Sequence, residues 1–162
     1  MAENYSVLMS VYYKEKPEYL REAMQSMFDQ TIPTNDFVLV CDGSLTKELD
    51  SVIEKMQKEH SELHVVRLKE NGGLGNALNY GMKFCKNELI ARMDSDDISY
   101  PVRCEKQLEI FNNKEVFAKI GEERKESLWL YESTNIIRAT KFTTFERCFR
   151  APSDSTVQDR CA

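Results

Sequence analysis

The sequence predicts an α/β fold in which a mainly parallel sheet carries helices on both faces. Between residues 1 and 111, apolar runs of strand length alternate four times with stretches whose apolar residues recur at helical spacing. Successive β-α units of this kind place their strands in parallel and lay their helices against the sheet. With 162 residues and 41% hydrophobic content, the chain is also large enough to bury a core.

The first two units are bounded by residues that favour turns. Pro17 stands at the start of the first helical stretch, and Pro33 lies beyond its end. The second strand ends at Asp42-Gly43-Ser44, which is a good turn sequence. The elements predicted here are a strand at 7–11, a helix at 20–28, a strand at 37–41 and a helix at 49–56.

The third and fourth units repeat the pattern. Gly72 and Gly73 make a turn ahead of the third helix, and Pro101 precedes the fourth. The elements predicted here are a strand at 64–68, a helix lined by Leu74, Ala77, Leu78, Gly81 and Cys85, a strand at 89–93 and a helix at 102–111.

The regular alternation is lost beyond Asn112. Residues 128–131 and 134–137 have the composition of short strands, whereas residues 114–127 are strongly charged and those after 139 follow neither period. We therefore expect two parts, an α/β domain at 1–111 and an incomplete or irregular segment at 112–162.

Composition excludes several classes of protein. A net charge of -5 argues against a general nucleic-acid binder, which would present a basic face. The five cysteines are scattered without a C-x-x-C pair, as is typical of reduced thiols and not of disulfide or zinc scaffolds. No signal peptide or membrane-spanning run is evident. We expect a cytoplasmic protein that binds no nucleic acid, with peripheral association at the inner face of a membrane left open.

The strongest signal for chemistry is the acidic stretch Asp94-Ser95-Asp96-Asp97, directly after the fourth strand. Confined carboxylates repel one another, so a divalent cation shared with phosphates would stabilise them. An acidic turn exposed to solvent is the plain alternative. A calcium loop running to Glu105 is rejected, because Ile98 stands where a ligand is needed and the sharp-turn glycine is missing.

The acidic stretch gains meaning from the ends of the other strands. Tyr12 follows the first strand, Asp42 the second and Asn71 the third, and in a parallel sheet these ends meet at one edge. An aromatic ring can stack on a base, a carboxylate can accept from it, and glycine-rich backbone can approach a diphosphate. Each signal alone has an ordinary structural alternative. Asp42-Gly43-Ser44 suits a turn, the glycines after Asn71 suit a helix entry capped by Asn71, and Tyr12 suits a half-buried loop aromatic. Together they predict a nucleotide site.

With these residues assembled, the chain resembles the donor-binding half of the family 2 glycosyltransferases, which have the GT-A fold. The resemblance covers about residues 5–111. The matching stretches are residues 6–12, 20–23, 38–44, 71–81 and 91–99, with Ser26, Met27, Gln30, Pro101 and Arg103.

The resemblance implies a role for each strand end. Tyr12 would lie against the nucleobase and Asp42 would read its edge, while Asp94-Ser95-Asp96 resembles the family's D-x-D motif. The implied nucleotide-binding residues are Tyr12, Asp42, Lys69, Asn71 and Asp94, and the implied ligands of Mg²⁺ or Mn²⁺ are Asp96 and Asp94. The implied partners are a nucleoside diphosphate sugar, with a UDP-sugar expected, and a saccharide or lipid-linked acceptor.

Two departures from the family pattern bear on function. Cys41 stands where many members carry an acidic residue. More important, an inverting transferase needs an Asp or Glu from its second half as general base, and no acid after residue 112 stands in a recognisable setting. The catalytic residue is therefore unknown.

The first hypothesis is a metal-dependent glycosyltransferase acting on an acceptor hydroxyl. The alternative is a nucleotide-sugar binding module, or a fragment without transferase activity because the acceptor half is missing. A nucleotidyltransferase is disfavoured, since no basic loop that would grip a triphosphate follows the first strand.

Overall fold

The computed structural model describes residues 4–112 and 136–138, and all four predicted β-α units are present. In chain order the elements are β1 (Tyr5–Val11), α1 (Pro17–Phe28), β2 (Asp36–Cys41), α2 (Lys47–Glu59), β3 (Leu63–Arg67), α3 (Leu74–Met82), β4 (Leu89–Asp94), α4 (Arg103–Asn112) and β5 (Ile136–Arg138).

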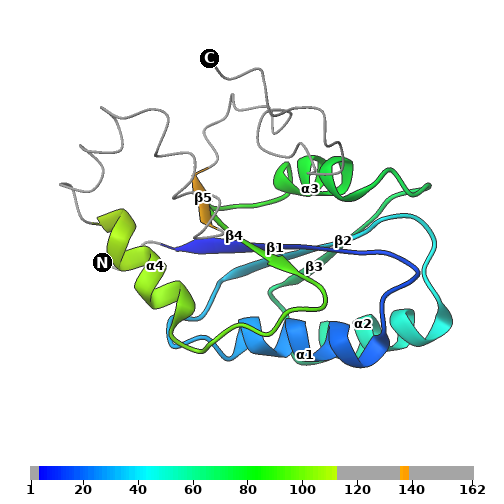
Figure 1. Cartoon of the computed structure of the whole chain (residues 1–162), viewed down its shortest axis with the longest axis horizontal. Coiled ribbons are helices and arrows are strands. Elements are labelled where there is room, and N and C mark those ends of the chain that lie inside the picture. Colours follow the sequence, from blue (N-terminus) through cyan, green and yellow to red (C-terminus); the bar gives the residue numbers. More distant parts are fainter. Residues whose placement is uncertain (1–3, 113–135, 139–162) are drawn as a thin grey trace, which may run out of the picture.

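The five strands form one sheet in the order β3-β2-β1-β4-β5 (Figure 1). The pairs β1–β2, β1–β4 and β2–β3 are parallel, whereas β5 pairs antiparallel with β4. The chain builds outward from β1 to β3 and then crosses back to place β4 on the other side of β1. The strand order therefore reverses between β1 and β4, and open α/β sheets bind ligands at the carboxyl ends of the strands beside such a reversal.

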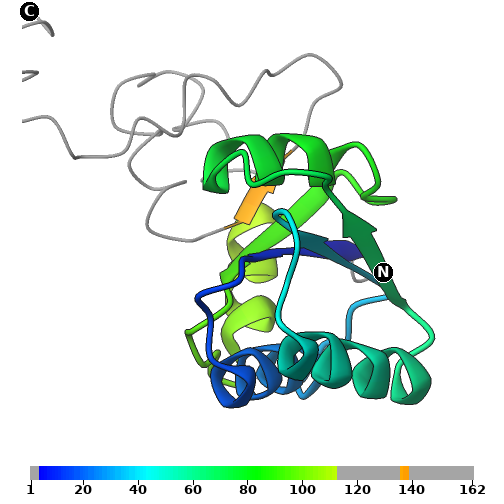
Figure 2. The same cartoon turned by 90° about the vertical axis from the view of Figure 1, so that its right-hand side faces the viewer.

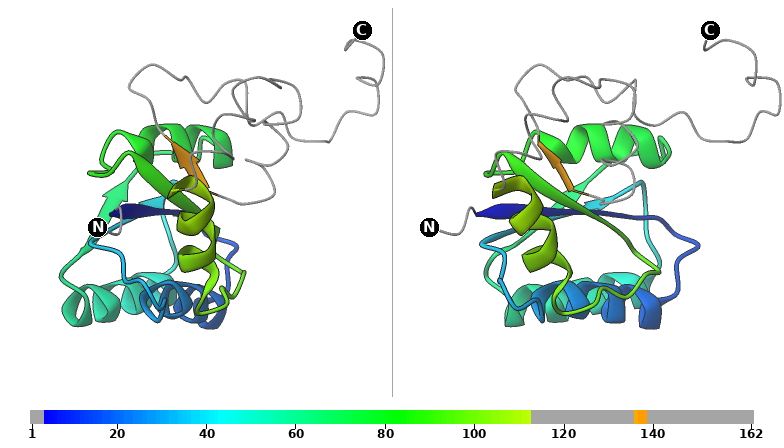
Figure 3. Two further views of the ribbon diagram at one scale, coloured as in Figure 1. Left: turned by 90° about the vertical axis from the view of Figure 1, so that its left-hand side faces the viewer. Right: turned by 60° about the vertical axis from the view of Figure 1, so that its left-hand side comes forward.

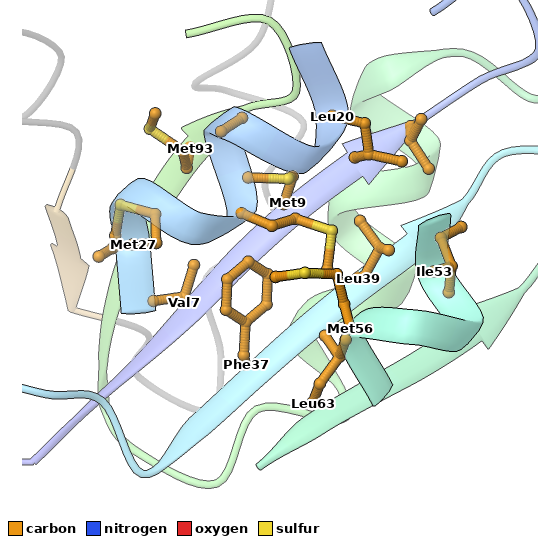
Figure 4. Close-up of a cluster of buried hydrophobic side chains, with 14 of the residues drawn as sticks. Val7, Met9, Leu20, Met27, Phe37, Leu39, Ile53, Met56, Leu63 and Met93 are labelled. Carbon is orange, nitrogen blue, oxygen red and sulfur yellow. The ribbon is translucent and has the colours of Figure 1, made fainter. Parts of the chain in front are cut away.

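Helices cover both faces of the sheet, as predicted (Figures 2 and 3). On one face, α1, α2 and α4 bury alternate strand residues such as Met9, Phe37 and Leu39, together with Met27 (Figure 4). On the other face, α3 buries a smaller cluster formed by Leu8, Val38, Val40, Ala77, Leu78 and Ile90. Because side chains alternate along a strand, β1, β2, β3 and β4 each contribute to both cores.

The predicted third helix is longer than the observed one. α3 ends at Met82, and Cys85 lies beyond it, where its thiol donates to the Gly81 carbonyl. Gly81 allows α3 to lie close to the sheet, because a Cβ there would come within 2.5 Å of Val40 Cγ2. The helix therefore packs on the sheet through glycine and small apolar residues.

Beyond residue 112, the structure describes one short strand. β5 overlaps the predicted strand at 134–137 but begins two residues later, while the possible strand at 128–131 lies outside the described residues. The division of the chain at residue 111 stays a prediction. No helix within the described part of the chain combines the length and the apolar character that crossing a bilayer requires.

Candidate functional site

The loops that carry the predicted site residues do lie at the carboxyl edge of the parallel strands. β1 ends at Val11, next to the end of β2 at Cys41, and Ser10 is aligned with Asp94 of β4. Tyr12, Asp42 and Asp94 are therefore brought to one edge by sheet register alone. Asp94 stands at the point where the strand order reverses.

The register also decides which face of the sheet these side chains occupy. Leu8 and Ile90 contribute to the core beneath α3. Ser10 on β1, and Arg92 and Asp94 on β4, follow at steps of two residues and share that face. Asp42 continues the same face of β2 from Val40. The polar side chains thus gather on the α3 side of the edge, just beyond the apolar core.

Asp42 is held by the loop between β3 and α3. The residue is 3% exposed, and its Oδ1 and Oδ2 accept backbone N–H groups from Gly72 at 2.8 Å and Gly73 at 2.9 Å. The Asn71 side chain donates to the Asp42 carbonyl at 3.2 Å. Asp42 therefore fixes the glycine loop, and reading of a base edge by the remaining lone pairs stays a prediction.

Two glycines shape this loop and the turn after β2 that packs against it. Gly43 has φ +85°, and a Cβ there would come within 2.8 Å of the Asn71 backbone nitrogen. Gly73, with φ +84°, is the N-cap of α3 and makes no side-chain capping bond. Asn71 is therefore not the helix cap. Its exposed side chain ties the loop to β2 and leaves the first turn of α3 uncapped.

Asp94 is paired with an arginine that the sequence interpretation did not include in the site. Arg92 Nη2 donates to Asp94 Oδ1 at 2.5 Å, and the two side chains are 19% and 37% exposed. Both residues lie on the α3 face of β4, two positions apart. Alternation along the strand puts Arg92 and Asp94 on the same face, and this could be predicted from the sequence. The side-chain conformation that brings them into contact could not be predicted.

The loops after β1 and β4 are joined at the reversal point. Ser95 Oγ donates to Glu15 Oε2 at 2.6 Å, and Glu15 Oε1 accepts the Lys16 backbone N–H at 2.9 Å. Ser95 is buried although its neighbours Asp96 and Asp97 are exposed. This contact joins residues that are 80 positions apart in the sequence. No pattern in the sequence predicted that Glu15 would belong to the site.

The far end of the acidic loop is anchored on the last turn of α1 and on Gln30 just beyond it. Gln30 Nε2 donates to Ser99 Oγ at 3.1 Å and to the Tyr100 carbonyl at 2.9 Å, while its Oε1 accepts the Cys104 N–H at 2.9 Å. The Ser99 N–H in turn donates to Ser26 Oγ. The loop is therefore fixed both at Ser95 and at Ser99, which presents residues 96–98 to solvent.

Arg103 supplies positive charge beneath the loop. Its Nη2 donates to the Arg92 carbonyl at 2.7 Å and its Nη1 lies 3.0 Å from Met93 Sδ. Burial lowers the pKa of Arg103, and the charges of Asp97 and Asp94 act in the opposite direction. An arginine keeps its charge under such a shift. Arg103 thus offsets part of the negative charge of the acidic stretch.

The donors at this edge fit a hard divalent cation that takes part of its shell from a ligand. Asp96 is exposed, and its carboxylate contacts no other residue that the structure describes through a hydrogen bond or ion pair. Within residues 4–112 and 136–138, no three His, Cys, Asp or Glu side chains are grouped to hold a metal ion. Two carboxylates completed by phosphate and water oxygens are a usual arrangement for Mg²⁺.

The remaining predicted residues lie around this edge. Tyr12 is 43% exposed, with its ring 5.9 Å from that of Tyr13 in an edge-on arrangement, so part of the side chain is accessible to a ligand. Lys69 is exposed on the loop that carries Asn71. The structure brings Asp42 and Asn71 into contact, and places Asp94 beside Arg92.

Comparison with known proteins identifies the family of the chain. A family model described as Glycosyl transferase family 2 matches residues 6–162. An uncharacterized glycosyltransferase of Haemophilus influenzae is 44% identical over 104 residues, which make up 64% of this chain and 39% of that protein. The UDP-Gal:alpha-D-GlcNAc-diphosphoundecaprenol beta-1,3-galactosyltransferase of Escherichia coli is 40% identical over 101 residues, or 62% of this chain and 36% of that enzyme.

Among solved structures, S. aureus TarS 1-349 in complex with UDP-GlcNAc is 27% identical, with a TM-score of 0.59 over 67% of this chain and 31% of that one. This likeness confirms the predicted GT-A fold. The chain spans about two-fifths of the length of the curated relatives it matches. Since the family model covers nearly the whole sequence, the chain belongs to glycosyl transferase family 2.

Proposed function

We propose that this chain is the donor-binding part of a glycosyltransferase that uses a nucleoside diphosphate sugar and a divalent metal ion. The sugar would pass to a hydroxyl group of an acceptor. The observation that carries this proposal is the gathering of Asp42, Asp94 and the Gly72-Gly73 loop on one side of the carboxyl edge.

Each part of the site has a chemical role in this proposal. Tyr12 stacks on the base, Asp42 and Asn71 shape the pocket beside it, and Lys69 adds positive charge near the nucleotide. Asp96 and Asp94 would hold Mg²⁺ or Mn²⁺, which when bound neutralises charge that develops on the leaving diphosphate. The general base that takes the acceptor proton is not among the residues that we assign.

The comparisons support a UDP-sugar as the donor and a lipid-linked saccharide as the acceptor. The solved TarS structure contains UDP-GlcNAc, and the name of the E. coli relative specifies a UDP-sugar donor and a diphosphoundecaprenol acceptor. An acceptor of this kind would place the protein at the cytoplasmic surface of a membrane. Both identities belong to those proteins and are proposals for this one.

Calorimetric titration of UDP, GDP and their sugars, with and without Mn²⁺, tests the proposal. We expect one class of nucleotide to bind only when Mn²⁺ is present. Asp96→Ala should weaken this binding about tenfold or more, equivalent to at least about 1.4 kcal/mol. Glu54→Ala, which removes an exposed acid on α2, is the matched control and should leave binding unchanged.

Failure of every nucleotide to bind in a metal-dependent way would overturn the proposal. Release of nucleoside diphosphate in the presence of saccharide and polyprenyl-linked acceptors tests the transfer step separately. Binding without such release would limit the function to donor binding.

A further inference from the structure

We infer that Arg92 is a positioning residue that makes metal binding at Asp94 and Asp96 conditional on the nucleoside diphosphate. The guanidinium would hold Asp94 when the site is empty, and would turn to the diphosphate when nucleotide and metal arrive together. This inference rests on the proposed function and extends it to the order in which the ligands bind.

The contact between Arg92 and Asp94 is the first step of the argument. The Nη2–Oδ1 distance is 2.5 Å, and the Arg92 side chain is 19% exposed. A charge-assisted bond that is partly shielded from water is stronger than one on an open surface. Any cation that takes Asp94 as a ligand therefore has to compete with a guanidinium already in place.

The balance of charge gives the second step. Asp94, Asp96, Asp97 and Glu15 carry four negative charges, and Arg92 and Arg103 bring two positive charges into contact with this strand end. The two arginines therefore offset half of the negative charge that would attract a divalent cation arriving alone. A bound nucleoside diphosphate adds negative charge and oxygen ligands, so it strengthens the attraction of the site for the metal.

The position of Arg92 gives the third step. It lies on the α3 face of β4, on the same side of the sheet as Asp42 and the Gly72-Gly73 loop. A guanidinium is a planar fork of five N–H donors, which matches a phosphate group as well as it matches a carboxylate. A diphosphate bound at this edge would therefore offer Arg92 a replacement for Asp94.

Binding of Mn²⁺ followed by electron paramagnetic resonance, with and without UDP, tests this inference. In the wild-type protein, UDP should tighten Mn²⁺ binding about tenfold or more, within the usual range of coupling between two ligands. In Arg92→Met, Mn²⁺ alone should bind several-fold tighter, because its competitor is gone. Mn²⁺ with UDP should bind several-fold weaker, so that the coupling largely disappears.

Arg92→Lys separates charge from shape. It keeps a cation beside Asp94 but loses the planar fork, so Mn²⁺ alone should bind as in the wild type while Mn²⁺ with UDP binds several-fold weaker. Arg67→Met is the matched control, because Arg67 pairs with Asp50 at 2.8 Å on the opposite face of the sheet. It should change neither affinity.

Three results would overturn the inference. The first is a coupling in Arg92→Met equal to that of the wild type, and the second is a parallel loss of both affinities, which indicates a structural role only. The third is Arg92→Lys binding like the wild type in both titrations, which is decisive even if Arg92→Met fails to fold. Absence of any metal-dependent nucleotide binding by the wild-type protein would instead count against the proposed function.

Discussion

At the scale of single residues, Asp42 is the predicted site residue whose structural role is clearest. Its two carboxylate oxygens accept separate backbone N–H groups from Gly72 and Gly73 while being almost fully buried. A neutral amide in this position would turn one acceptor into a donor facing an N–H group. The loop that borders the proposed nucleotide pocket therefore depends on the charge of this side chain.

Asp42→Asn is expected to lower the free energy of unfolding by about 1–3 kcal/mol, the usual cost of losing a buried hydrogen bond to a charged group. Nucleotide binding should weaken as well, because the glycine loop loses its anchor. Urea unfolding and nucleotide titration measure the two effects. Asp50→Asn, which breaks an exposed ion pair with Arg67, should cost at most about 1 kcal/mol.

The cysteines give a second prediction at this scale. Cys41 and Cys104 are buried and Cys85 partly so, and burial raises the pKa of Cys41 to about 11 and of Cys85 to about 12. In a variant with Cys148 and Cys161 replaced by serine, the three remaining thiols should react with a disulfide reagent at pH 8 only after unfolding. Rapid reaction of the native protein would contradict the buried placement.

The same pKa shifts set the direction of a pH effect on stability. The folded state keeps the Cys41 thiol protonated up to about pH 11, whereas the unfolded chain releases that proton near the ordinary value of 9.0. This contribution is therefore complete below about pH 9 and is lost as pH rises toward 11. Urea unfolding at pH 8 and pH 10 should show the decline, and Cys41→Ala should show a smaller one.

Arg92 and Glu15 show where residue-level prediction from sequence stops. The acidic stretch and the strand-end residues were identifiable from their types and spacing. The bond from Ser95 to Glu15 joins residues 80 apart, and depends on β4 lying beside β1. The local sequence does not specify that β4 lies beside β1. The hydrogen-bond partners of the predicted site residues therefore could not be predicted from the sequence.

At the scale of elements, α3 is held against the sheet by close packing at one glycine. A Cβ at Gly81 would come within 2.5 Å of Val40 Cγ2 and 2.6 Å of Leu8 Cδ1. Gly75, in the first turn of the same helix, has no atom within 4 Å of such a Cβ. The two glycines therefore differ in packing although they share a helix.

Gly81→Ala is expected to destabilise the protein by about 1–3 kcal/mol, since added volume in a filled core forces neighbours to move. Gly75→Ala should be neutral or stabilise by up to about 1 kcal/mol, because alanine favours the helix. Thermal or urea unfolding of both variants gives the comparison. Equal effects at the two positions would argue against the close packing of α3.

The elements themselves were largely predictable from apolar periodicity, because each has one or two buried faces. The apolar residues at helical spacing that predict α1 and α2 are also the residues that these helices bury. The end of α3 was less predictable, since Cys85 continues the apolar spacing but lies past the last helical turn. Cys85 packs against the smaller core although it is not helical, so its apolar spacing did not mean that the helix continued.

At the scale of the whole molecule, the site exists because the strand order reverses between β1 and β4. The sequence predicts parallel strands whose ends share an edge, but it does not state their order. That order puts Asp94 next to Ser10 and leaves Asp42 one strand away. The neighbour of β4 on its other side, β5, comes from beyond residue 112, where the apolar pattern is weak.

The location of the metal within this fold is the most direct test of the account. Substoichiometric Mn²⁺ added with UDP to ¹⁵N-labelled protein broadens amide signals close to the ion. We predict strong broadening of residues 94–97 and of Ser10, Gly72 and Gly73. Broadening should be clearly weaker at Ser6 and Asp36, which lie four residues, or about 13 Å, further back along the strands, and at Asn87 beside Ser6. Broadening centred on the opposite edge of the sheet, or spread evenly over the protein, would contradict the assignment of the carboxyl edge as the donor site.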